Sequence, residues 1–209
     1  MKRARVPIYI TLILVAFGTA QQSLDFLGRE RISSIAILPP IGQSAPDSTR
    51  QAAVDMLATK LGLAVAGLRI ARPDVFLKEL QAKGGLTDYT NLVTLFSQSG
   101  LADPESVKRL AKISEADALL LVNVLDYDEQ KGSWWYGKGG KNVCRIQYTL
   151  FRAATGEKLW QTLEFRQHDS KVSTNPYPME HVIGDVTDKA VSALLVGRQD
   201  IDVRQKTVK

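Results

Sequence analysis

The stretch ALLLVNVL, residues 118–125, is apolar at every position except Asn123. Successive side chains of a strand point to opposite faces of a sheet, so a run that is apolar at odd and even positions alike predicts a strand covered on both faces. We therefore expect residues 118–125 to form the central strand of a sheet that carries helices on each side.

Strand and helix patterns alternate on either side of this run. Upstream, residues 34–38 form a short apolar run that two prolines end, which predicts a buried first strand. The helical stretches show apolar residues at three- and four-residue spacings and start signals such as Asp103 followed by Pro104. The expected upstream elements are a strand at 34–38, a helix that begins at Asp47 or Ser48 and that Gly62 and Gly67 end, a short strand at 68–70, a helix from Pro73 to Gly84, a short helix at 89–98 and a helix after Asp103.

Downstream, residues 143–151 and 159–167 predict two strands joined by a tight turn at Gly156, and a helical stripe from Met179 to Leu194 follows. Alternate residues of the first of these strands share an apolar face, so we expect one covered face and one face that is wet or paired with a partner. The predicted fold class is α/β: a mixed sheet of about five strands with helices packed on it, in the order strand, helix, strand, helices, three strands, helix.

The chain of 209 residues has 44% hydrophobic and 23% charged residues, which is typical of one globular domain. We expect a signal peptide or membrane anchor at 1–20, a connector at 21–33, one α/β domain at 34–196 and a charged, disordered tail at 197–209.

The N-terminus has the order of a secretory signal: cations at positions 2, 3 and 5, an apolar run, and small residues at 18–20. As a helix, residues 6–20 would measure about 22 Å, which is short of the roughly 30 Å hydrocarbon core of a bilayer. We therefore expect cleavage after Ala20; the alternatives are an uncleaved inner-membrane anchor and a buried cytosolic helix. In the first two cases the domain is exported to the periplasm, because the positive end stays in the cytoplasm.

The formal net charge of +5 lies at the two ends of the chain. Residues 21–197 hold 20 basic and 20 acidic residues. Nucleic-acid binding needs several clustered cations to displace counterions. We therefore expect no nucleic-acid partner.

Few residues suggest chemistry. His168 and His181 have no second His or Cys at metal-ligand spacing, and the sequence has no nucleophile elbow, zincin or phosphate-loop motif. The single cysteine, Cys144, alternates with apolar residues and suits a small buried hydrophobe better than a reactive thiol. We expect no metal, no cofactor and no enzymatic activity.

The most unusual segment is EQKGSWWYGKGGKN, residues 129–142, between two predicted strands. The candidate contact residues in it are Trp134, Trp135, Tyr136, Lys131, Lys138 and Lys141. Large aromatic side chains on such a loop either fold back over the sheet as a lid or contact a membrane, a glycan or a protein partner. The sequence leaves both alternatives open.

Three segments carry a family resemblance: SIAILPP (34–40), DPESVKRLAKISEADALLLVNVLDY (103–127) and IQYTLFRAATGEKLWQTLEF (146–165). They resemble the small α/β domains of bacterial envelope proteins related to the N-terminal domain of the TolB translocation protein, to the curli-secretion lipoproteins and to the penicillin-binding-protein activator lipoproteins. The nearest likeness is to uncharacterised TolB-like periplasmic lipoproteins, which share a first strand ending in Leu-Pro-Pro and a TGEKLW-type hairpin. The chain departs from them in having no lipid-attachment cysteine at the end of its apolar run.

The resemblance implies a non-enzymatic accessory or assembly factor of the cell envelope that acts by protein–protein contact in the periplasm. Its partners would be envelope proteins, such as those of an outer-membrane or cell-wall assembly complex. The alternative is a module that binds cell-wall glycan (peptidoglycan) or a membrane surface.

Overall fold

A computed structural model describes residues 26–42, 44–136, 138–170 and 173–199, apart from the side chain of Trp134. The helices are α1 (Phe26–Arg29), α2 (Asp47–Ala64), α3 (Pro73–Lys83), α4 (Leu86–Ser99), α5 (Pro104–Ser114) and α6 (Met179–Val196), with a 3-10 turn η1 (Trp134–Tyr136). The strands are β1 (Ser34–Ile37), β2 (Arg69–Ala71), β3 (Ala118–Gln130), β4 (Lys141–Arg152) and β5 (Lys158–Asp169).

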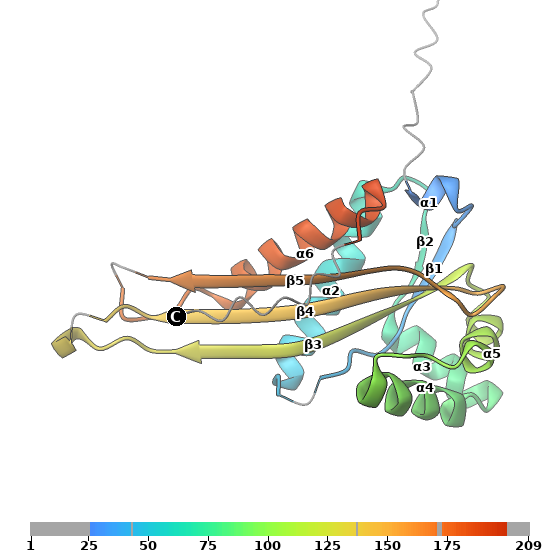
Figure 1. Cartoon of the computed structure of the whole chain (residues 1–209), viewed down its shortest axis with the longest axis horizontal. Helices are drawn as coiled ribbons and strands as arrows, with labels where there is room; N and C mark the ends of the chain where they lie inside the picture. Colours follow the sequence, from blue (N-terminus) through green and yellow to red (C-terminus); the bar gives the residue numbers. More distant parts are fainter. Residues whose placement is uncertain (1–25, 43, 137, 171–172, 200–209) are drawn as a thin grey trace, which may run out of the picture.

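The strands form one mixed sheet in the order β2-β1-β3-β4-β5 (Figure 1). Strands β2 and β3 both pair parallel to β1, whereas β3, β4 and β5 pair antiparallel. Helices α2 and α6 cover one face of this sheet, and α3, α4 and α5 cover part of the other. The predicted fold class and element order are confirmed.

The first half of β3 is buried on both faces, as its sequence predicts. Leu119 and Leu121 pack in a cluster with α3, α4 and α5, while Leu120 and Val122 pack in a cluster with α2 and α6. All four side chains are fully buried. This stretch of β3 therefore belongs to two hydrophobic cores at once.

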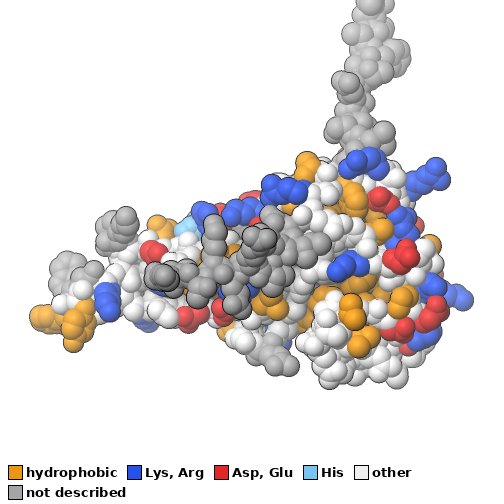
Figure 2. All heavy atoms as spheres, in the orientation of Figure 1, with side chains coloured by type: hydrophobic (Ala, Val, Ile, Leu, Met, Phe, Trp, Pro, Cys, Tyr) orange, Lys and Arg blue, Asp and Glu red, His pale blue; other side chains and the backbone are white. Residues whose placement is uncertain are grey.

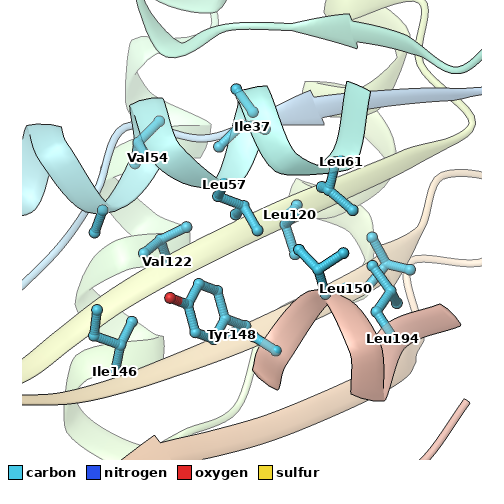
Figure 3. Close-up of a cluster of buried hydrophobic side chains, with 14 of the residues drawn as sticks. Ile37, Val54, Leu57, Leu61, Leu120, Val122, Ile146, Tyr148, Leu150 and Leu194 are labelled. Carbon is cyan, nitrogen blue, oxygen red and sulfur yellow. The ribbon is translucent and has the colours of Figure 1, made fainter. Parts of the chain in front are cut away.

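The larger core lies between the sheet, α2 and α6. Figure 3 shows Leu57 and Leu61 of α2 and Leu194 of α6 directed at the strands, with Tyr148 and Leu150 of β4 between them. The apolar residues of α2 recur at three- and four-residue spacings, which explains why one side of the helix is buried and the other is wet. The Tyr148 hydroxyl lies 3.2 Å from the Thr187 hydroxyl of α6, so its polar end is satisfied.

The smaller core depends on α5, whose start is fixed by local chemistry. The Asp103 carboxylate accepts hydrogen bonds from the backbone N–H groups of Glu105 and Ser106, and Pro104 occupies the first turn. Phe96 of α4 meets Phe151 of β4 edge to face, with ring centroids 6.2 Å apart. The cap thus positions the helix layer that closes the second face of β3.

A single carboxylate joins the start of β3 to the start of β1. Asp117 Oδ2 accepts hydrogen bonds from the backbone N–H and the hydroxyl of both Ser33 and Ser34, at 2.7–2.9 Å. Burial alone would raise the pKa of Asp117, but these hydrogen bonds outweigh it and hold the pKa below its ordinary value. The parallel pair is therefore fixed in register at this end.

Three details differ from the sequence expectations. β3 continues to Gln130 rather than ending at residue 125, because β4 pairs with it through its polar outer half as far as Gln130 opposite Lys141. The expected connector at 21–33 contains α1, a helix too short to show a periodic pattern, whose Leu27 is buried in the larger core. Helix α2 has Pro46 at its N-cap without a side-chain cap, and it runs through Gly62 to Ala64.

The calls on residues 1–20 and on most of the tail at 197–209 lie outside the described residues. Within the described ranges, no helix has the length and apolar composition needed to cross a membrane. Cleavage after Ala20 stays a prediction.

We predict that Leu120→Asp abolishes folding, because a carboxylate at this position has no partner to offset several kcal/mol of desolvation. Leu63→Asp is the matched control, since Leu63 of α2 is 83% exposed. Circular dichroism and thermal melting of the two variants check this. A cooperative melt for Leu120→Asp close to that of the control would show that β3 is not the central strand.

Candidate functional site

The strands β3 and β4 form a hairpin that reaches past both helix layers, and η1 lies at its tip (Figure 1). We call residues 131–141 the aromatic tip. Its loop is closed by a bridge in which the N–H of Ser133 donates to the Lys138 carbonyl at 2.8 Å and the N–H of Lys138 returns a bond of 3.0 Å. A Cβ on Gly132 would lie 2.2 Å from the Lys138 carbonyl oxygen, so this crossing of the chain needs glycine.

The segment between β5 and α6 braces the base of the tip. The N–H groups of Gly132 and Gly140 donate to the carbonyls of Thr174 and Ser173, at 2.7 and 3.0 Å. A Cβ on Gly140 would lie 2.4 Å from the backbone of Asn175, so only glycine permits this approach. The sequence analysis missed this brace; the glycines that flank the aromatics were its only signal.

The brace is itself tied to α6 through β5. His168 of β5 lies 3.0 Å from the Asp185 carboxylate of α6, and Arg166 forms an ion pair with the same carboxylate at 3.2 Å. The ring of Tyr177 lies 4.9 Å from that of His168, and its backbone N–H donates to the side chain of the buried Asn142. These contacts anchor the hairpin to the body of the domain.

The aromatic side chains that the structure describes at the tip stand in solvent. Trp135 is 91% exposed and Tyr136 is 79% exposed. In Figure 2, hydrophobic side chains gather at the end of the hairpin, where Figure 1 places η1. A lid would instead bury these rings on the sheet. The side chain of Trp134 lies outside the described residues, and the contact role of all three aromatics stays a prediction.

The tip is also cationic. Lys131 and Lys138 are exposed and Lys141 is half-buried, and none of the three forms an ion pair within the part of the chain that the structure describes. Residues 131–141 contain no acidic side chain, histidine or cysteine. Flat aromatic surfaces beside cations suit binding by stacking, by insertion and by contact with acidic groups.

The remaining reactive groups have structural positions. Cys144 is fully buried in the larger core, and burial, with a smaller contribution from the charge of Asp126, raises the pKa of its thiol to about 12. The prediction of a small buried hydrophobe is confirmed. Over the described ranges, no group of three His, Cys, Asp or Glu side chains is placed to hold a metal ion.

Comparisons with known proteins agree with this architecture. No family model matches the chain, and no curated protein sequence matches it. Among solved structures, the PelC dodecamer from Paraburkholderia phytofirmans is similar with a TM-score of 0.51 at 14% identity, over 79% of this chain and 90% of the PelC chain. That match shows a common fold.

Two further matches are more distant. Lipoprotein GNA1162 from Neisseria meningitidis has a TM-score of 0.43 at 19% identity, over 77% of this chain and 99% of that chain. The LpoB C-terminal domain from Escherichia coli has a TM-score of 0.40 at 13% identity, over 64% of this chain and 82% of that chain. Scores this low carry no argument by themselves. The neighbours are bacterial envelope lipoprotein-like folds, as the sequence resemblance implies, and none of these three is a TolB protein.

We predict that Trp135→Ala leaves the melting temperature within a few degrees, because the ring buries almost no area in the folded chain. Trp160→Ala is the matched variant: Trp160 is 1% exposed in the larger core. Its truncation should cost about 3–5 kcal/mol. Differential scanning calorimetry of both variants measures the contrast. An equal loss of stability in the two would place Trp135 in the core.

Proposed function

We propose that this chain is a non-enzymatic accessory or assembly factor of the bacterial cell envelope that contacts another envelope protein through its aromatic tip. One observation carries the proposal: Trp135 and Tyr136 stand in solvent on a hairpin whose base is braced. Exposed large aromatics are costly in a soluble protein, and hot spots of protein interfaces are enriched in Trp and Tyr.

The brace makes the tip suited to binding. Ordering a mobile loop on association costs free energy, and a loop already held by its neighbours avoids part of that cost. The backbone bonds from Gly132 and Gly140 to the 173–174 segment hold the base of the tip before any partner arrives. The tip and α1 lie at opposite ends of the domain (Figure 1), so a chain held near α1 can present the tip to a partner a domain's length away.

The sequence supports an envelope location for this activity. The export signal expected at 1–20 would deliver the domain to the periplasm, with or without retention of an inner-membrane tether. The fold shared with PelC supports the same assignment, and the PelC structures are dodecamers. A second copy of this chain is therefore the first alternative partner for the tip.

A photo-cross-linking amino acid tests the proposal in intact cells. Placed at position 135 of the full chain, it should yield a discrete adduct with an envelope protein. Placed at position 63, on an equally exposed part of α2, it should yield none. Loss of the 135 adduct on Tyr136→Ala would assign the contact to the tip.

Other outcomes replace this partner. An adduct of twice the chain's mass would make the tip a contact between copies. Sedimentation with sacculi or anionic vesicles that Trp135→Ala with Tyr136→Ala abolishes, without a protein adduct, would favour the glycan or membrane module. Identical adducts from positions 135 and 63 would contradict a specific site at the tip.

A further inference from the structure

A hollow of about 590 Å³ opens at the end of the domain opposite the aromatic tip. We call it the basal hollow. It lies between the second half of α5, the segment after α1 and the end of β4. Its lining residues are Glu30, Arg31, Ile32, Lys108, Ala111, Lys112, Glu115, Ala116, Asp117, Arg152, Ala153 and Ala154.

Two backbone outliers line this hollow. Arg31 has a φ of 56° and Glu115 a φ of 50°, and every other described residue with positive φ is a glycine. A side chain in the left-handed region costs on the order of 1 kcal/mol relative to glycine. Glycine would serve the backbone better at both positions. Their coincidence at one hollow indicates that the side chains are used there.

Cations enter the hollow from three separate elements: Arg31 from the segment after α1, Lys108 and Lys112 from α5, and Arg152 from β4. Within the described residues, Arg31 and Lys112 form no ion pair. Lys108 pairs with Glu105 at 2.8 Å, but both side chains are largely exposed, so the pair contributes little. Lys108 and Lys112 are four residues apart on one helix and repel each other.

The acidic residues of the lining are already engaged. Glu30 forms an ion pair with Arg152. Asp117 accepts the hydrogen bonds of Ser33 and Ser34. The Glu115 carboxylate is 77% exposed and faces Lys83 at 3.9 Å. The hollow therefore offers free cationic donors but no free carboxylate buried among them.

We propose that the basal hollow binds a phosphate group carried on a small organic body. A guanidinium donates to phosphate oxygens in a planar fork, and lysine adds a point charge. Tetrahedral phosphate presents oxygens in several directions, which matches cations arriving from three elements, whereas a carboxylate is planar and carries one charge. The alanines at 111, 116, 153 and 154 form a small apolar wall that leaves room for the body of the ligand.

Titration of the full chain in a neutral detergent, followed by phosphorus NMR, tests the site with inorganic phosphate and with glycerol phosphate. We expect line broadening with a dissociation constant of about a millimolar. Mixed micelles containing phosphatidylglycerol, compared with phosphatidylcholine, separate a lipid source from a soluble one: competition by phosphatidylglycerol alone assigns the lipid, and its absence assigns the soluble ester.

The variants are Arg31→Gly and Lys112→Gln, with Lys78→Gln as the control because Lys78 is an exposed lysine of α3 outside the hollow. Each hollow variant should weaken phosphate binding about tenfold or more. Lys78→Gln should not. Glycine accepts the left-handed conformation, so Arg31→Gly should melt within a few degrees of the parent chain.

Absence of broadening in the parent chain would overturn the proposal. So would an equal loss of affinity in all three variants, because that result reports net charge rather than a site. Trp135→Ala with Tyr136→Ala should leave phosphate binding unchanged, so failure of this site and failure of the aromatic tip give different results.

Discussion

The first half of β3 packs on two hydrophobic cores at once, and the rest of the structure depends on that constraint. Leu119 and Leu121 close the core under α3, α4 and α5, while Leu120 and Val122 close the core under α2 and α6. Neither helix layer could cover its face of the sheet without this strand between them. The Asp117 carboxylate fixes where the strand begins, because it holds β3 in register with β1.

Once β3 is fixed at one end, its other end is free to extend. The pairing with β4 continues as far as Gln130, well past the helices, and β5 follows β4 over almost its whole length. An isolated hairpin of this length would be marginal in water. A third strand and the ion pairs from β5 to Asp185 of α6 stabilise it. The domain thus has a packed body that carries a basal hollow and a braced arm that carries an aromatic tip.

The sequence predicted what local chemistry determines. An apolar run on both faces identified the core of β3, and the Asp103 and Pro104 pair identified the start of α5, because these signals act within a few residues. The polar outer half of β3 was misjudged as a strand exit, since cross-strand pairing rather than side-chain polarity keeps it extended. The aromatic tip was named from composition alone.

Other features were out of reach of sequence patterns because they arise between distant segments. The brace joins Gly140 to residues 173–175, and no periodicity reports that contact. The basal hollow assembles Arg31, Lys112 and Arg152 from three elements, and the left-handed backbone at Arg31 has no signal in the residue type. Both required the fold before they could be seen.

Native-state hydrogen exchange along β3 tests the central claim most directly. The amides of residues 119–122 should exchange only through global unfolding, with an opening free energy equal to that of the whole domain, while the amides of residues 127–130 should exchange through local opening at lower free energy. Protection that is equal along the strand, or weaker at 119–122 than at 127–130, would contradict the account that the doubly buried half of β3 holds the structure together.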